Sequence, residues 1–180
     1  MGHSTRPFDL FLALLSAHGI ETVADVRRYP GSRRWPQFSR DALSEALGAH
    51  GIAYQWFPDL GGRRDPAADS VNTGWRNKAF RGYADYMETG EFADGLVSLL
   101  NAALGSRTAI MCAEAVWWRC HRGLIADVLR WLGLDVRHIM SIESAELHPY
   151  TPPARIVDGR LSYAADAPGR PSANFPRTTP

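Results

Sequence analysis

Residues 112–123, CAEAVWWRCHRG, combine several side chains that can do chemistry. They hold both cysteines of the chain together with a glutamate, a histidine and two arginines. A buried helix does not need such a mixture of thiol, carboxylate, imidazole and guanidinium groups. Four interpretations are compatible with these residue types: a phosphatase-like cysteine loop, a metal site, catalysis without a metal, and a purely structural network.

The spacing within this stretch weakens the first two interpretations. A phosphatase-like loop places five residues between its cysteine and an arginine, and Arg119 comes one residue too late after Cys112. Cys112, Glu114, Cys120 and His121 are all zinc-ligand types, but the C-x2-C and H-x3-H spacings are absent. Adjacent cysteine and histidine residues are also rarely ligands to one ion. The sequence therefore assigns no metal ligands, and a metal site remains an alternative.

Catalysis without a metal needs a nucleophile and groups that exchange protons. Both cysteines lie near the start of a predicted helix, where the helix dipole and nearby arginines lower a thiol pKa, so either is a candidate nucleophile. Glu114 is a candidate general acid or base, and His3 or His121 a second one. In the structural alternative the cysteines are small buried hydrophobes, and Arg122 pairs with Glu114 or Asp25.

The bulk composition is that of an ordinary globular domain. The chain has 180 residues, of which 45% are hydrophobic and 22% charged, enough for one domain with a sizeable core. The sequence has no run of eighteen apolar residues and no secretory signal pattern. Two cysteines are too few for a disulfide scaffold. We therefore expect a cytoplasmic protein with free thiols and no membrane association.

Positive charge is concentrated between residues 27 and 81. This segment has nine arginines and Lys78 against five acidic residues, a local excess of five positive charges. Arginine forks suit phosphates and carboxylates, so a small anionic ligand is the expected partner. The alternative is a nucleic-acid-binding module, in which Trp35, Trp56 and Trp75 would stack on bases.

Periodicity and turn residues predict alternating helices and strands. Strands are expected at 21–27, 52–57, 107–112 and 134–142, and helices at 8–18, 40–50, 80–87, 92–104 and 120–133. This order predicts an α/β fold with a mainly parallel sheet covered on both faces. An α/β domain would normally begin with a strand where this chain has Met1 to Ser4, so two alternatives are open: the sheet starts at Thr22, or a first strand has been lost.

Polar residues follow each predicted strand. Ligands of open parallel sheets bind beyond the carboxyl ends of the strands, so these residues are expected to meet at one edge of the sheet. They are Asp25, Arg27 and Arg28; Gly61, Gly62 and Arg63; Cys112 and Glu114; and Cys120, His121 and Arg122, with His3 and Ser4 where a first strand would end.

Four motifs together resemble one known family. GHSTRPF, VADVRRYPGSR, GIAYQWFPDLGGR, and CAE followed by CHR are similar to the domain of unknown function 488 family, over about residues 2–140. The resemblance implies a Rossmann-like three-layer α/β domain, usually with a strand before the GHS motif. It assigns no reaction. The matched positions are His3, Ser4, Asp25, Arg27, Ser32, Gly61, Gly62, Cys112, Glu114, Cys120, His121 and Arg122.

The leading hypothesis is an enzyme that binds a phosphate- or nucleotide-like anion at this edge of the sheet. The expected catalytic residues are Cys112, Glu114, Asp25, Cys120 and His121. The expected substrate-binding residues are His3, Ser4, Arg27, Ser32, Gly61, Gly62 and Arg122. The sequence predicts one domain over residues 1–150, a hairpin extension over 151–167 with its turn at Asp158-Gly159, and a disordered tail over 168–180. The cofactor, the reaction and the oligomeric state are not defined by the sequence.

Overall fold

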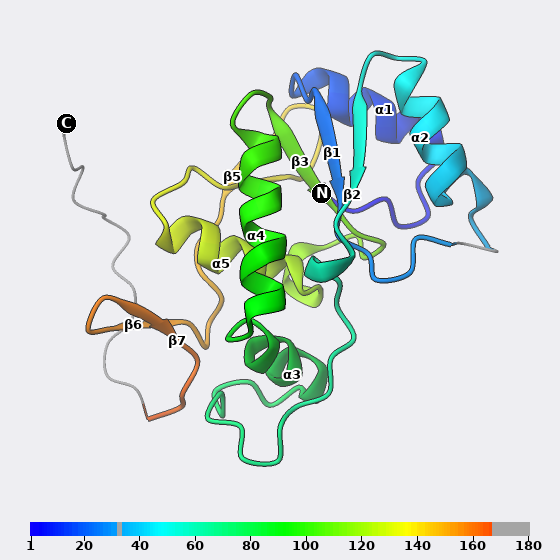
Figure 1. Ribbon diagram of the computed structural model, residues 1–180. Coiled ribbons are helices and arrows are strands. Elements are labelled where there is room, and N and C mark those ends of the chain that lie inside the picture. Colours follow the sequence, from blue (N-terminus) through cyan, green and yellow to red (C-terminus); the bar gives the residue numbers. More distant parts are fainter. Residues whose placement is uncertain (32–33, 167–180) are drawn as a thin grey trace.

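A three-stranded parallel sheet forms the centre of the protein, in a computed structural model that describes residues 1–31 and 34–166. Its strands are β1 (Thr22–Asp25), β2 (Ala53–Trp56) and β3 (Thr108–Met111), in the order β2-β1-β3. The three arrows point the same way, so their carboxyl ends meet at one edge (Figure 1). The parallel core of the predicted fold is thereby confirmed.

Helices cover both faces of this sheet. Helices α1 (Phe8–Ala17) and α2 (Arg40–Gly48) pack on one face, and α4 (Gly90–Ala103) and α5 (Arg122–Trp131) lie on the other. Helix α3 (Lys78–Tyr86) belongs to the same apolar core as α4 and α5 but lies beyond the carboxyl ends of the strands. Three short 3₁₀ helices connect them, at Pro36–Phe38, Pro58–Leu60 and Trp117–Arg119. Within the described part of the chain, no helix is long and apolar enough to cross a membrane.

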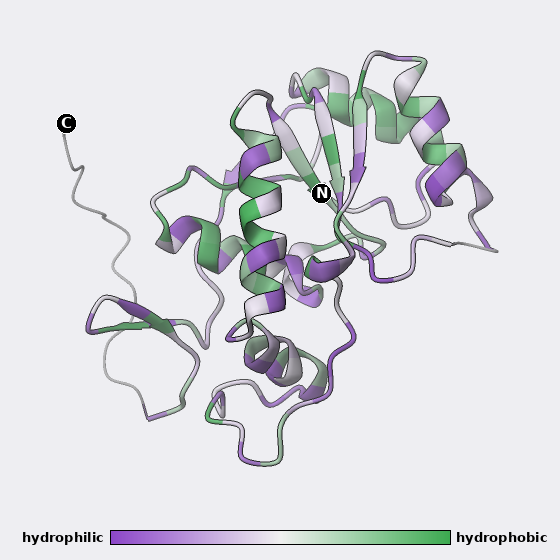
Figure 2. Cartoon of the chain, in the orientation of Figure 1, coloured by the Kyte–Doolittle hydropathy of each residue, from purple (hydrophilic) through white to green (hydrophobic). Residues whose placement is uncertain are grey.

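The central strand explains why both faces must be covered. All four residues of β1 are buried, and successive side chains point to opposite faces. Val23 packs in the core beneath α1 and α2, with Phe11 and Leu43, whereas Ala24 belongs to the core beneath α4 and α5, with Leu124. The helices carry apolar stripes toward the sheet and polar residues toward solvent (Figure 2). Because β1 is buried on both faces, apolar side chains must cover it from both sides.

The prediction of a last strand in the core sheet was wrong. The segment expected at 134–142 forms β4 (Arg137–Ile139), which pairs antiparallel with β5 (Ala145–Leu147) in a separate two-stranded sheet. The carboxyl end of β3 is instead paired with the first residues of the chain. Gly2 forms a parallel bridge with Cys112, and the Met1 amino group donates to the Ile110 carbonyl. The segment after α5 therefore pairs with the segment that follows it.

A β-hairpin is present where the sequence predicts one. Strands β6 (Arg155–Val157) and β7 (Arg160–Ser162) pair antiparallel. Asp158 and Gly159 in the turn have φ angles of 49° and 76°, the left-handed region that favours this residue pair. The predicted disordered tail, residues 168–180, lies outside the described residues.

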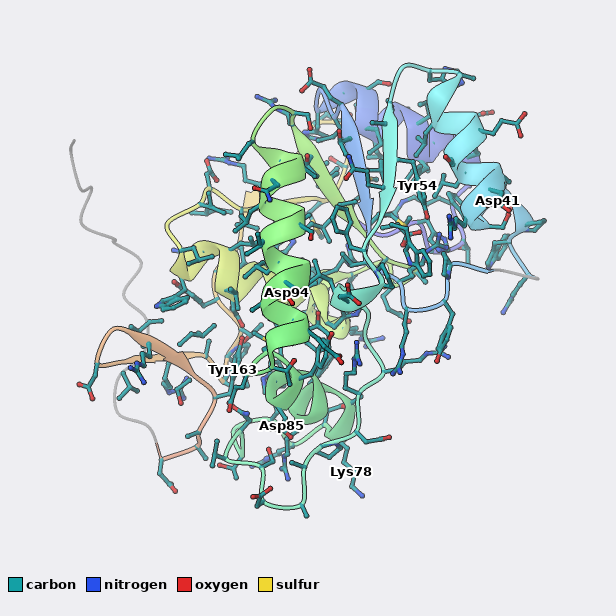
Figure 3. The ribbon with its side chains drawn as sticks, viewed as in Figure 1. Asp41, Tyr54, Lys78, Asp85, Asp94 and Tyr163 are labelled. Carbon is teal, nitrogen blue, oxygen red and sulfur yellow. The ribbon has the colours of Figure 1, made fainter. Side chains whose placement is uncertain are left out.

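A buried carboxylate fixes the C-terminal segment to α5. Asp127 is fully buried and accepts hydrogen bonds from His148 Nε2, the Thr151 amide and hydroxyl, and the Tyr163 hydroxyl. His148 Nδ1 lies 2.9 Å from Nε2 of His138, so the two histidines share one hydrogen bond. Tyr163 comes from the segment after the hairpin (Figure 3). Four donors on one carboxylate make this network a fixed connection between distant segments.

This network predicts acid sensitivity of the fold. Burial, followed by the charges of His148, the amino terminus and Arg122, lowers the pKa of His138 from its ordinary 6.5 to about 3. Because the unfolded histidine takes up the proton first, the stability from this group is complete above pH ~6.5 and falls as the pH drops toward 3. The loss is about 1.4 kcal/mol per pH unit.

Chemical denaturation between pH 7 and 5 checks this expectation. His138→Gln should have a shallower dependence of unfolding free energy on pH, by about one proton, and the exposed His50→Gln should behave like the parent. An unchanged slope in His138→Gln would show that His138 does not titrate with folding.

Candidate functional site

A pocket of about 290 Å³ lies at the carboxyl edge of the sheet. It is bounded by the segments that follow all three strands and by the start of α5. The residues that give it polar character are Arg27, Arg28, Gly62, Arg63, Cys112, Glu114, Arg119, Cys120 and His121. Segments far apart in the sequence therefore meet at the edge where the strand order places them.

The turn between β3 and α5 brings its thiols and imidazole together. Cys120 has an extended backbone (φ −138°, ψ 147°), and His121 is helical (φ −56°, ψ −17°). This change of direction lets two adjacent side chains converge, with Cys120 Sγ 3.6 Å from His121 Nδ1. Nε2 of His121 lies 3.0 Å from the Val26 carbonyl, which ties the turn to the end of β1. A carbonyl oxygen can only accept, so Nε2 carries the proton.

The two buried thiols differ in their electrostatics. Both cysteines are free, as predicted. A hydrogen bond from Cys112 is the main cause that lowers the pKa of Cys120, and His121 and Arg122 act in the same direction. The same hydrogen bond, together with burial, raises the pKa of Cys112. Arg122 also contacts Cys120 directly, with Nε 3.3 Å from Sγ. These contacts therefore favour the thiolate form at Cys120 over Cys112.

A buried ion pair between Asp25 and Arg27 lies behind one wall of the pocket. Asp25 is fully buried and accepts from the Arg27 guanidinium at 2.5 Å and from the Tyr54 hydroxyl at 2.6 Å. The remaining arm of Arg27 donates to the Phe38 carbonyl at 2.8 Å, and it lies 3.3 Å from Nε2 of His3. The pair thus joins β1, β2 and the loop before α2.

The GHS segment supports the pocket from behind. His3 is buried and stacks on Phe38, with ring centroids 4.3 Å apart. The amides of His3 and Ser4 donate to the carbonyls of Cys112 and Ala113. Neither side chain lines the pocket, so the structure places these two residues where they hold the end of β3. Their expected substrate contacts stay a prediction.

The glycine pair allows a close approach of two backbones. A Cβ on Gly61 would lie 2.7 Å from Cα of Arg28, and one on Gly62 would lie 2.7 Å from Nδ1 of His121. Gly62 lines the pocket and Gly61 lies behind it. Any side chain at residue 62 would fill the space in front of the imidazole.

Several expected placements were wrong. Glu114 was expected to pair with Arg122 in the structural alternative, but its side chain is exposed and Arg122 binds its backbone carbonyl (Nη2 to O 2.5 Å) instead of its carboxylate. The Arg122 side chain, in the first turn of α5, extends back to the end of β3. There the peptide carbonyl of Glu114 is nearer to the guanidinium than the Glu114 carboxylate, which points outward. Asp25 and Arg122 are buried but do not line the pocket, contrary to the expected cluster around one cavity. Ser32 lies outside the described residues.

Three arginines line the pocket that the sequence did not assign to substrate binding: Arg28, Arg63 and Arg119. Arg28 and Arg63 were expected at this edge because they follow strands, but they were given no role. Arg119, in a 3₁₀ turn, had no such signal and was missed. Tyr54 was also missed, because a tyrosine within a strand has no distinctive pattern.

A larger cavity of about 530 Å³ runs along the open edge of β3. Its walls combine aliphatic side chains from α4, α5 and the segment at β4 with polar ones such as Arg107, Arg137 and His138, and neither thiol lines it. Sites for reacting groups need nucleophilic or proton-exchanging side chains that converge. The smaller pocket brings two thiols and an imidazole together among arginines, so it is the candidate functional site.

Comparison with known proteins identifies one family. A family model described as "Domain of unknown function DUF488" matches residues 7–129. The chain therefore belongs to the DUF488 family, as its motifs indicated. The matched range contains the three strands of the parallel sheet, helices α1 to α4, most of α5 and the pocket residues. No curated protein and no solved structure matches the chain.

The ion pair behind the pocket yields a test of the role of Asp25. Asp25→Asn keeps the shape of the side chain but leaves the Arg27 charge buried without compensation. The free energy of unfolding should fall by about 3 kcal/mol. Urea denaturation measures it, with Asp41→Asn, exposed on α2 (Figure 3), as the matched control. Parent-like stability of Asp25→Asn would instead favour a catalytic role for this carboxylate.

Proposed function

We propose that this protein is an enzyme that binds an anionic, phosphate-like group of its substrate in the pocket at the carboxyl edge of the sheet. The observation that carries the proposal is the set of uncompensated arginines around the thiol–imidazole cluster. Among the described residues, Arg28, Arg63 and Arg119 form no ion pair with a carboxylate, and Glu114 is the one acidic side chain in the lining. Guanidinium groups with free donors are suited to phosphate oxygens.

The start of α5 adds to this positive field. The helix begins at Arg122, beside the pocket, and its N-terminal amides carry a partial positive charge. The reacting groups are assigned to the cluster of Cys112, Cys120 and His121, because thiols and imidazoles form and break bonds to protons and electrophiles under mild conditions. Glu114 lies at the exposed rim, where a carboxylate can exchange protons with solvent.

The nucleic-acid alternative has less support. Trp56 donates its indole N–H to the Arg27 carbonyl and is covered by Arg40, and Trp75 packs against Phe80. These two indoles are engaged within the fold, so base stacking would require them to leave existing contacts.

Several finer features belong to the same proposal. A Rossmann-like arrangement is supported by the parallel sheet with helices on both faces. A cytoplasmic location is supported by two buried, free thiols, which persist in reducing compartments. A single unit over residues 1–150 with a hairpin extension is supported by the position of β6 and β7 at its end.

Binding of phosphate compounds tests the proposal. Calorimetric titration with inorganic phosphate and ribose 5-phosphate should give saturable binding that weakens with salt, whereas ribose should not bind. Arg119→Ala should weaken the affinity about tenfold, the scale of one charged hydrogen bond. The exposed Arg160→Ala, on the hairpin, is the matched control. No saturable binding, or equal affinity in Arg119→Ala, would contradict the proposal.

A further inference from the structure

The geometry points to a thiophilic metal site: we propose that Cys112, Cys120 and His121 bind one divalent ion of the zinc type. Their ligand atoms, two Sγ and one imidazole nitrogen, all lie within 4.8 Å of one another. Both cysteines are buried and the histidine is half-buried. The inference goes beyond the proposed function and does not depend on binding of the anion.

The separation between Cys120 Sγ and the His121 imidazole fits tetrahedral coordination. Zinc–sulfur bonds of about 2.3 Å and zinc–nitrogen bonds of about 2.0–2.1 Å place tetrahedral sulfur and nitrogen ligands roughly 3.6 Å apart. Cys120 Sγ and His121 Nδ1 are 3.6 Å apart. Adjacent residues rarely share a metal, but the extended backbone of Cys120 followed by the helical backbone of His121 removes that obstacle.

The hydrogen bond of the imidazole selects the tautomer that suits a metal. Because Nε2 of His121 donates to the Val26 carbonyl, the lone pair of the neutral ring is on Nδ1. Histidine ligands commonly donate their other ring N–H to a carbonyl in this way, which fixes the orientation of the ring. Nδ1 points toward Cys120, so the tautomer and the direction both suit coordination.

Gly62 keeps the space in front of this nitrogen open. A Cβ there would lie 2.7 Å from Nδ1, a distance at which an ion or its fourth ligand would be excluded. Three protein ligands leave one coordination position of a tetrahedral ion vacant, as in catalytic zinc sites. Both thiols and Gly62 line the pocket, so this position is open to small molecules.

The donor set selects the class of metal. Two thiolates and one imidazole are soft or borderline ligands, which favour Zn²⁺ over Mg²⁺ or Ca²⁺. Two thiolates also neutralise the double charge of the ion. This balance allows the ion to bind among the surrounding arginines.

Cobalt(II) titration of the full chain, in phosphate-free buffer after reduction and removal of metals, tests the site. We expect one equivalent of Co²⁺ to produce thiolate-to-cobalt absorption in the near ultraviolet, and Zn²⁺ to displace it. The chain has two cysteines, so this band can arise only from them. Mg²⁺ should not compete.

Matched variants locate the ion. Cys112→Ser, Cys120→Ser and His121→Asn should each lose more affinity than the roughly 10- to 100-fold caused by removing an outer hydrogen-bond partner. Gly62→Ala retains every ligand and should also weaken binding, whereas His50→Gln should bind like the parent. Circular dichroism confirms that each variant is folded.

Two results would overturn the proposal. One is the absence of thiolate–cobalt absorption in parent protein whose two thiols are free by chemical titration. The other is unchanged cobalt affinity in folded Gly62→Ala and His121→Asn. Because no phosphate is present, neither result bears on the anion site.

Discussion

The carboxyl edge of the sheet depends on the buried ion pair between Asp25 and Arg27. Asp25 has no exposed surface, and its oxygens accept from Arg27 and from Tyr54 on the neighbouring strand. Arg27 extends the connection to Phe38 in the loop before α2. A buried pair of this kind resists disruption, because removing either partner leaves an uncompensated charge away from water. It fixes where β1 ends and where Arg28 begins the pocket wall.

The opposite wall is fixed by contacts of the turn between β3 and α5. His121 donates to the Val26 carbonyl, and Arg122 spans from Cys120 to the Glu114 carbonyl. These contacts hold two thiols and an imidazole in one orientation while they still line the pocket. The rigid cluster and the uncompensated arginines are therefore separate features of one cavity, the first suited to bond chemistry or metal binding and the second to an anion.

Sequence patterns predicted the three strands of the parallel sheet, the five helices and the meeting of the strand ends, because strand and helix periodicities are local and parallel strands share one carboxyl edge; they did not predict how the segment at β4 pairs. They did not predict side-chain direction. Glu114 follows β3 by only a few residues, and a single-residue change in where the chain turns decides between solvent and core. The convergence of Cys120 and His121 depends on backbone angles that residue types do not determine. The network of Asp127, His138 and His148 requires an antiparallel pairing that no spacing in the sequence indicates.

The central claim is that a cationic pocket surrounds reactive sulfur. Alkylation of the metal-free protein with iodoacetate and with iodoacetamide, followed by mass spectrometry, measures this directly. Both reagents attack the thiolate, so the fraction of thiolate cancels in the ratio of the iodoacetate rate to the iodoacetamide rate. Because only iodoacetate carries a negative charge, this ratio reports the electrostatic potential at the sulfur. The account predicts a ratio several-fold above that of free cysteine, falling toward it as salt is added. A ratio equal to or below that of free cysteine at low salt would contradict it.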